Sequence, residues 1–106
     1  NMFIKNVKKW FLYIANFPET MIDAYKIAEK LRENGISCDV NLRKRSLSKQ
    51  LEYANALNVK YVIIVGKKEL QEKKVTLRDM ENGNENMLSI EEIIKKFKEK
   101  KLNDEN

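Results

Sequence analysis

The stretch that decides the fold is VNLRKRSLSKQLEYANALNVKYVIIVGKKELQEKKVTLRD, residues 40–79 of the 106-residue chain. Near its centre, Tyr61–Val65 is apolar throughout, which is typical of a strand buried on both faces of a sheet. Ahead of that strand, Ser46 is a suitable N-cap for a helix that ends at about Leu57. The inward positions of this helix would be Leu47, Leu51, Ala54 and Leu57. Beyond the strand, residues 75–80 alternate between apolar and polar and predict a further strand with one solvated face.

The N-terminal part repeats this pattern of apolar strand and amphipathic helix. Residues 10–16 (WFLYIAN) form a continuous apolar run and predict another buried strand. Residues 20–33 then predict a helix in which Thr20 and Asp23 form a capping box. The apolar stripe of this helix comprises Met21, Ala24, Tyr25, Ala28 and Leu31. A third strand is expected at residues 36–42.

The C-terminal part predicts a hairpin followed by a last helix. Asn82-Gly83 is a hairpin signal, so residues 85–88 should pair with the strand before them. Ser89 and Glu92 have the spacing of a capping box at the start of a helix. The apolar positions of this helix are Ile90, Ile93, Ile94 and Phe97. Residues 99–106 lose the periodicity and are expected to fray, which leaves an ordered core at about residues 8–98 of a single domain. Three apolar strands linked by helices indicate an α/β fold with parallel βαβ units.

The composition limits the classes of function. The net charge of +5 and the pI of about 9.3 favour an anionic partner, although a lysine-rich surface that only maintains solubility explains the same numbers. The lone Cys38 is expected to be a small buried side chain, and no apolar run approaches the length of a transmembrane helix. Because Asn1 precedes Met2, we expect either a residue left by a tag or a piece of a longer protein.

Catalytic chemistry has little support in the sequence. The first strand is followed by NFPET, where a dinucleotide site would need G-x-G-x-x-G, and there is no Walker A loop. The chain has no His to act as the base of a hydrolase, and Gly66 occupies the position where a phosphoacceptor domain would have Asp. The acids Glu19, Asp23, Glu29 and Glu33 lie along one predicted helix surface and do not converge as metal ligands. We therefore predict no catalytic residue, cofactor site or metal site.

The strongest candidate site is a basic turn after the strand at 36–42. Arg43, Lys44 and Arg45, with Lys49 one helical turn later, carry four positive charges with no acid among them. They lie at the carboxyl end of a predicted parallel strand and at a helix N-terminus, and both locations favour anions. The turn is therefore predicted to contact a phosphate backbone. The alternative is a solvated turn in which Arg45 pairs locally.

Two further candidates lie later in the chain. Lys67 and Lys68 follow the strand 61–65, at the same sheet edge as the first turn, and could hold phosphates, while Glu69 could accept a hydrogen bond from a base. Arg78 lies on the solvated face of the next strand and could stack on a base or bond its edge. The alternatives are a charged loop and a local ion pair of Arg78 with Asp79 or Glu81. The aromatic residues Trp10, Phe11, Tyr13 and Tyr25 have core spacing and are expected to be buried.

Five segments of this chain resemble the C-terminal anticodon-binding domain of histidyl-tRNA synthetases, a domain shared with threonyl, prolyl and glycyl enzymes. These segments are AYKIAEKLRENGI (24–36), RSLSKQLEYANAL (45–57), YVIIVGKKEL (61–70), KVTLRDMENGNE (74–85) and LSIEEI (88–93). The resemblance covers about residues 10–97, and its most specific part is the combination of RSL-x-KQL with VG-x-x-EL and KVTLRDM. It implies a three-layer α/β sandwich with a five-stranded mixed sheet and three helices.

The resemblance also implies roles and partners. By position, Lys44, Glu69 and Arg78 would recognise anticodon bases of the histidine tRNA, while Arg43, Arg45, Lys49, Lys67 and Lys68 remain the phosphate candidates. At Lys44 the family usually has Gly. The parent would be a cytoplasmic, homodimeric ligase that uses ATP and Mg in a separate catalytic domain, so this chain alone would not aminoacylate. The alternatives are an interaction or regulatory module that lost RNA recognition, and a small nucleotide-binding protein.

Overall fold

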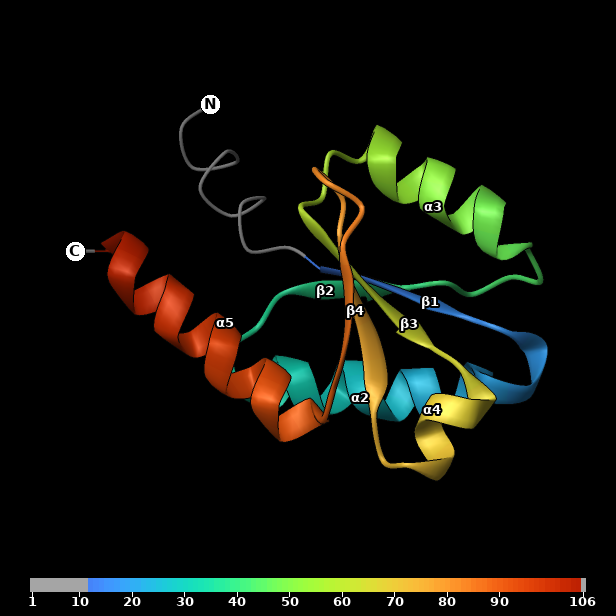
Figure 1. Ribbon diagram of the computed structural model, residues 1–106, viewed down its shortest axis with the longest axis horizontal. Helices are drawn as coiled ribbons and strands as arrows, with labels where there is room; N and C mark the ends of the chain where they lie inside the picture. The colour runs from blue at the N-terminus through green and yellow to red at the C-terminus, as the bar shows by residue number, and fades with distance from the viewer. Residues whose placement is uncertain (1–11, 106) are drawn as a thin grey trace.

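The computed structural model describes residues 12–105 (Figure 1). The elements in chain order are β1 (Leu12–Asn16), the 3-10 turn η1 (Pro18–Thr20), α2 (Met21–Glu33), β2 (Cys38–Val40), α3 (Leu47–Ala56), β3 (Tyr61–Val65), α4 (Lys67–Gln71), β4 (Val75–Asp79), β5 (Glu85–Leu88) and α5 (Ile90–Glu105). Trp10 and Phe11, expected in the core, lie outside the described residues. No helix in residues 12–105 is both long enough and apolar enough to span a membrane.

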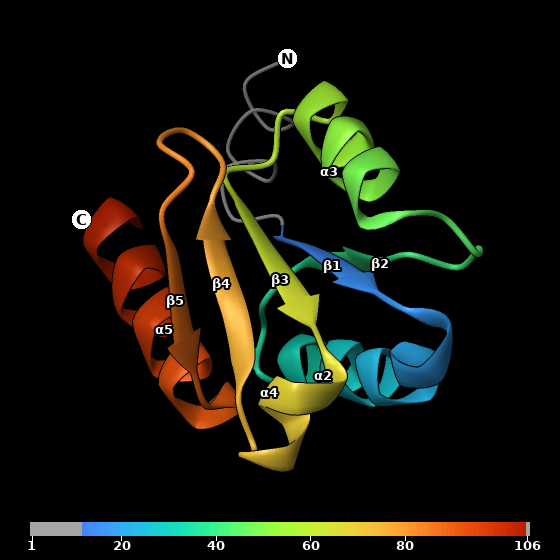
Figure 2. The same cartoon turned by 45° about the vertical axis from the view of Figure 1, so that its right-hand side comes forward.

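The strands form one mixed sheet in the order β2-β1-β3-β4-β5 (Figure 2). Strand β1 pairs in parallel with both β2 and β3, while β4 pairs antiparallel with β3 and with β5. The carboxyl ends of β1, β2 and β3 therefore meet at one edge of the sheet. This arrangement confirms the predicted five-stranded mixed sheet and the α/β class.

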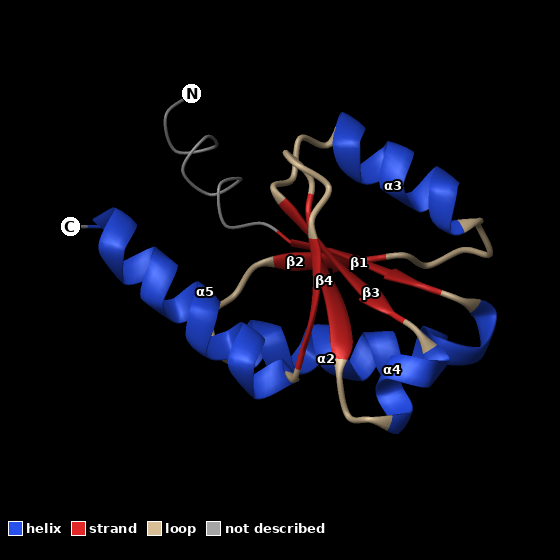
Figure 3. Ribbon diagram, viewed as in Figure 1, coloured by secondary structure: helices blue, strands red, loops and turns tan. Residues whose placement is uncertain are grey.

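Helices cover both faces of the sheet and make three layers (Figure 3). Helices α2 and α5 pack on the face that contains Ile14 and Ile63, whereas α3 packs on the opposite face against Tyr13 and Val62. Successive side chains of a strand point to opposite faces, so β3 is apolar at every position and β1 is apolar up to Asn16, the buried polar residue at its end. Strand β4 has one covered face only, since Val75 and Leu77 are buried while its alternate residues are partly exposed.

Several local predictions are confirmed. The Ser46 side chain accepts a hydrogen bond from the Lys49 N–H and caps α3. Gly83 has a φ of +78°, as the hairpin between β4 and β5 requires. Ser89 and Glu92 form the capping box of α5, because each side chain accepts the other residue's backbone N–H. Cys38 and Tyr13 are buried, as expected.

Other local predictions are wrong. The segment after β3 is the short helix α4 and not a charged turn. Within residues 12–105 this five-residue helix adds to the three longer α-helices that were expected. Its residues, KKELQ, are good helix formers, and Gly66 is its N-cap. In α2, Ile27 is buried together with the predicted Ala24, Ala28 and Leu31, whereas Tyr25 is 38% exposed.

The ends of the elements also differ from expectation. The capping box of Thr20 with Asp23 is absent, because the Thr20 hydroxyl donates to the Val65 carbonyl at 2.7 Å and ties η1 to the end of β3. Strand β2 has three residues, where seven were expected at 36–42. The backbone of α5 is helical to Glu105, beyond the loss of periodicity after Phe97, while fraying of residues 99–106 stays a prediction.

Candidate nucleic-acid interface

The basic turn between β2 and α3 is anchored by three buried amide side chains. Asn16 ends β1, Asn41 follows β2, and Gln50 lies on the inner side of α3. The Gln50 side chain pairs with the Asn16 backbone in both directions: its Oε1 accepts from the Asn16 N–H at 2.9 Å, and its Nε2 donates to the Asn16 carbonyl at 2.8 Å. The Asn16 side chain donates to the Asn41 carbonyl at 2.9 Å. Two strand ends and one helix are thus joined by a closed set of hydrogen bonds.

The same amides hold the backbone of the turn itself. Gln50 Nε2 also donates to the Arg45 carbonyl at 2.9 Å, and Asn41 Nδ2 donates to the Arg43 carbonyl at 2.6 Å. The carbonyls of both arginines are therefore turned toward the protein, while the side chains from Arg43 to Arg45 are exposed. The backbone of the turn is held by buried amides while its cationic side chains face solvent. Such a turn suits a phosphate backbone, because binding costs little further conformational entropy in the protein backbone.

Local partners of two of these cations are weak. The Arg45 guanidinium lies over the Tyr53 ring, 5.5 Å from its centroid, so the arginine does pair locally but keeps its charge. Lys49 lies 3.4 Å from the Glu52 carboxylate in an exposed ion pair one turn along α3. An exposed pair of this kind contributes about 0–1 kcal/mol, and a phosphate can replace the carboxylate at little cost.

The second candidate segment lies at the same sheet edge, on the other side of the sheet from the basic turn. Lys67 and Lys68 are exposed on the first turn of α4, which begins directly after β3 (Figure 1). The Glu69 carboxylate is folded back over Gly66, at a position that a Cβ on residue 66 would occupy. Glycine at this position leaves room for the carboxylate. Leu70 of α4 packs against the core beneath α2, whereas the basic turn leads into α3.

Arg78 lies at the opposite end of the sheet from these segments. It pairs with Val62 near the start of β3, on the α3 face, whereas Gly66 follows the end of that strand. Its Nη1 is 2.8 Å from Glu85 Oε2, so the local ion pair is with Glu85 and not with Asp79 or Glu81. The Arg78 Nε is buried without a hydrogen-bond partner. The structure therefore joins the two basic segments at one edge and leaves Arg78 apart from them.

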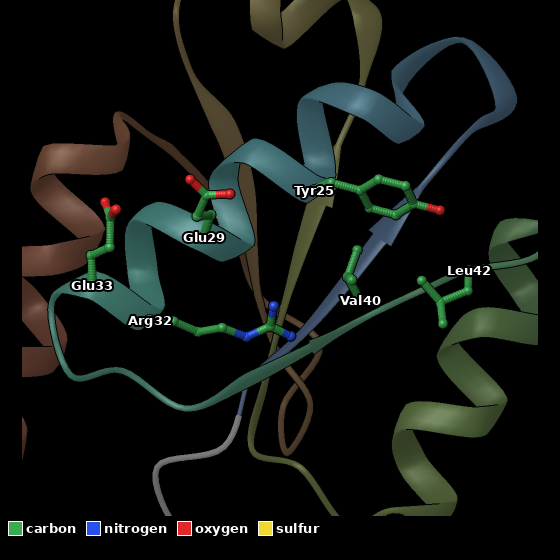
Figure 4. Close-up of a pocket in the computed structure, with 6 residues that line it drawn as sticks. All are labelled: Tyr25, Glu29, Arg32, Glu33, Val40 and Leu42. Atoms are coloured by element: carbon green, nitrogen blue, oxygen red, sulfur yellow. The ribbon is translucent and has the colours of Figure 1, made fainter.

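A groove lies between α2 and β2, apart from the basic turn, and is unsuited to an anion. This β2-edge groove has a volume of about 600 Å³, and its lining is mainly apolar where Tyr25, Val40 and Leu42 face one another (Figure 4). Its charged residues are Glu29, Arg32 and Glu33. Arg32 donates to the Cys38 carbonyl at 3.0 Å, and its single positive charge faces the two carboxylates, so the charges of the lining sum to −1 and disfavour phosphate. An anionic ligand is therefore directed to the basic turn and not to this groove.

Comparison with known proteins identifies the family. Residues 12–100 match the family model described as "Anticodon binding domain". The chain belongs to the anticodon binding domain family. The domain is 45% identical over 86 residues to the histidine–tRNA ligase of Methanosarcina acetivorans, and 47% identical over 75 residues to that of Pyrococcus horikoshii. These alignments cover 81% and 71% of this chain but 21% and 17% of the ligases, so the chain spans about a fifth of the length of these relatives.

Solved structures agree with this assignment. The domain superposes on the histidyl-tRNA synthetase of S. aureus with a TM-score of 0.74 and 26% identity, over 86% of this chain and 24% of that one. It also shares the fold of the RNA binding domain of threonyl-tRNA synthetase from Cryptosporidium parvum Iowa II, with a TM-score of 0.80 at 20% identity, over 87% and 23% of the two chains. The resemblance seen in the sequence is therefore confirmed.

The amide network was not predicted from the sequence. Gln50 lies three residues after Leu47 and four before Ala54, so helical spacing already put it on the buried face of α3. Asn16 and Asn41 each stand next to the carboxyl end of a predicted strand, which is where polar side chains meet in a parallel sheet. These two signals, taken together, would have predicted a polar cluster beneath the basic turn.

Proposed function

We propose that this domain binds the anticodon loop of a tRNA, and that the histidine tRNA is its ligand. The observation that carries the proposal is the basic turn 43–45, whose backbone is hydrogen-bonded to buried amides while its cations remain exposed. The relatives are histidine–tRNA ligases, which supports the choice of tRNA. Phosphate contacts fix the position of the RNA, and base contacts supply the specificity.

The proposal divides the site residues into two groups. Arg43, Arg45 and Lys49 of the basic turn, together with Lys67 and Lys68 of α4, would contact phosphates along one edge of the sheet. The base-recognition residues would be Lys44, Glu69 and Arg78. Because Arg78 lies at the other end of β3, a loop that reached all three would cross the sheet with its bases unstacked, which is how proteins usually recognise single-stranded RNA.

The properties of a complete ligase are part of the same proposal. A parent enzyme would bring a catalytic domain that uses ATP and Mg, would act as a homodimer and would work in the cytoplasm. The fraction of the relatives that this chain covers, about a fifth, is consistent with a tRNA-binding part of such an enzyme.

Fluorescence anisotropy tests the proposal with a labelled histidine anticodon stem-loop. The control RNA has the same stem and a scrambled loop of the same composition. We expect tighter binding of the authentic loop, and an affinity that falls by somewhat less than one log unit per log unit of salt for each phosphate contact. Equal affinities for both loops would refute anticodon recognition, and no salt dependence would refute the role of the basic turn. For a substitution in the basic turn, such as Arg43→Ala, the matched control is Lys95→Ala on α5. It also removes one exposed positive charge, but outside the proposed surface.

A further inference from the structure

A crevice with mixed charge opens beside the basic turn, between β2 and α3. Its volume is about 200 Å³, and its lining includes Tyr13, Asp39, Asn41, Arg43, Arg45 and Tyr53. Tyr13 and Asn41 are buried and form its floor, whereas the two arginines and Tyr53 are exposed around its mouth. The crevice is therefore polar at its base, aromatic on the α3 side and cationic at its opening.

The aromatic side of the crevice is held rigidly. The Tyr53 ring meets the Tyr13 ring edge-on, with 5.6 Å between centroids, and carries the Arg45 guanidinium on its outside. The Tyr13 hydroxyl is fixed in turn by Asn41 Oδ1, at 3.4 Å. An aromatic ring with a guanidinium over it offers a stacking surface, and both groups are used by proteins to stack unpaired bases.

The acid on the β2 side has no cationic partner in this crevice. Asp39 is the direct neighbour of Tyr13 in the parallel pairing, so the two side chains lie on the same face of the sheet. One Asp39 oxygen accepts the Val40 N–H at 3.0 Å. Within the described part of the chain, no ion pair joins Asp39 to Arg43 or Arg45, although all three line the same space. A carboxylate at this position repels phosphate. Attraction of phosphate alone therefore does not explain why Asp39 lines the crevice.

We propose that this crevice holds one unstacked nucleobase that carries an exocyclic amino group, stacked against Tyr53 and Arg45 and donating that amino group to Asp39. Arg43 at the mouth would hold a phosphate next to the same nucleotide. A carboxylate accepts from the amino groups of cytosine, adenine and guanine, whereas uracil presents a carbonyl in that position. The inference rests on the proposed function, and it adds the subsite, the stacking residues and the class of base.

The test measures coupling between one protein side chain and one RNA base. Each loop nucleotide of the anticodon stem-loop is replaced in turn by an abasic residue, and the affinity is measured for the intact domain and for Tyr53→Leu. In the intact domain, one abasic position should weaken binding about 5- to 150-fold, the range of a base–aromatic stack. In Tyr53→Leu, the penalty at that position should vanish while the penalties elsewhere persist. Tyr25→Leu is the matched control, because Tyr25 has a similar exposure on the opposite side of the sheet.

Asp39→Ala tests the recognition of the amino group. At the coupled position, an analogue that lacks the exocyclic amino group should bind the intact domain more weakly, and Asp39→Ala should abolish this difference. Arg45→Ala provides a second stacking variant in case Tyr53→Leu does not fold. Loss of its phosphate contact would weaken binding of every abasic loop alike, so only the loss of stacking is coupled to one position. If the intact domain binds the loop but the penalties of RNA and protein changes simply add at every position, the crevice is not a base subsite and the proposed function stands. If the intact domain binds neither the authentic anticodon stem-loop nor the stem-loop with the scrambled loop, both proposals are overturned.

Discussion

Replacing Gln50 by Leu removes the side chain that ties β1, the basic turn and α3 together. The Asn16 N–H and carbonyl, both bonded to Gln50, would lose these partners within the protein, and the Arg45 carbonyl would lose its anchor. Each buried polar group left without a partner costs about 1–3 kcal/mol. The two Asn16 groups alone therefore predict a loss of about 2–6 kcal/mol, which is a large part of the stability of a typical domain.

Urea unfolding followed by circular dichroism measures this loss. The matched control is Gln71→Leu, which makes the same chemical change at an exposed position of α4 and should alter stability by less than about 0.5 kcal/mol. The affinity for the anticodon stem-loop should fall in Gln50→Leu even where it remains folded, because the turn must then be ordered on binding. A Gln50→Leu variant within 1 kcal/mol of the parent would refute the claim that the amide network holds this edge of the sheet.

Three further predictions follow from other parts of the structure. Arg43→Ala should weaken binding of cognate and non-cognate tRNA equally, whereas Glu69→Ala should reduce the preference for the histidine tRNA by about 1–3 kcal/mol. If Glu69→Ala leaves the ratio of the two affinities unchanged, Glu69 does not recognise a base. Burial raises the pKa of Tyr13 to about 12 from 10.0, so its contribution to stability is complete below pH 10 and is lost as the pH rises through 12. The difference in unfolding free energy between the parent and Tyr13→Phe should thus change by up to about 3 kcal/mol over that interval, and a flat difference would contradict the shift. Ser89→Ala should lower the free energy of unfolding by about 1 kcal/mol, because it removes the N-cap of α5. It should also raise the pKa of Glu92, since hydrogen bonds with Ser89 lower that pKa, and an NMR titration of the Glu92 carboxyl checks the change.

Much of the fold follows from the sequence because burial leaves a periodic trace. Strand β3 is apolar at every position, and β1 at every position before Asn16, because both of their faces are covered. Strand β4 alternates because one of its faces is open. The same reasoning assigned Tyr25 to the core and passed over Ile27, since a helix stripe read at spacings of three and four admits either residue. Helix α4 was missed because its five residues, all but one of them polar, have no apolar periodicity.

The site was predicted only in part, for a related reason. The strand ends brought Arg43 and Lys67 to one edge, because parallel strands finish together and this needs no side-chain detail. The position of Arg78 depends on the direction and register of β4, which its local pattern does not contain. Gln50 was missed because its helical spacing is that of a core residue whereas its side chain is polar like that of a surface residue. Its burial becomes clear only from its hydrogen-bond partners, the Asn16 N–H and carbonyl.

An NMR titration of the 15N-labelled domain with the histidine anticodon stem-loop tests the central claim most directly. It separates two basic surfaces of the same molecule: the basic turn at the carboxyl ends of the parallel strands, and the exposed lysines Lys95, Lys96 and Lys98 of α5. We predict that the largest amide shifts fall on residues 41–49 and 66–69, and that a scrambled loop gives smaller shifts at these residues. Shifts confined to α5, with the amides of 41–49 unchanged, would contradict the account.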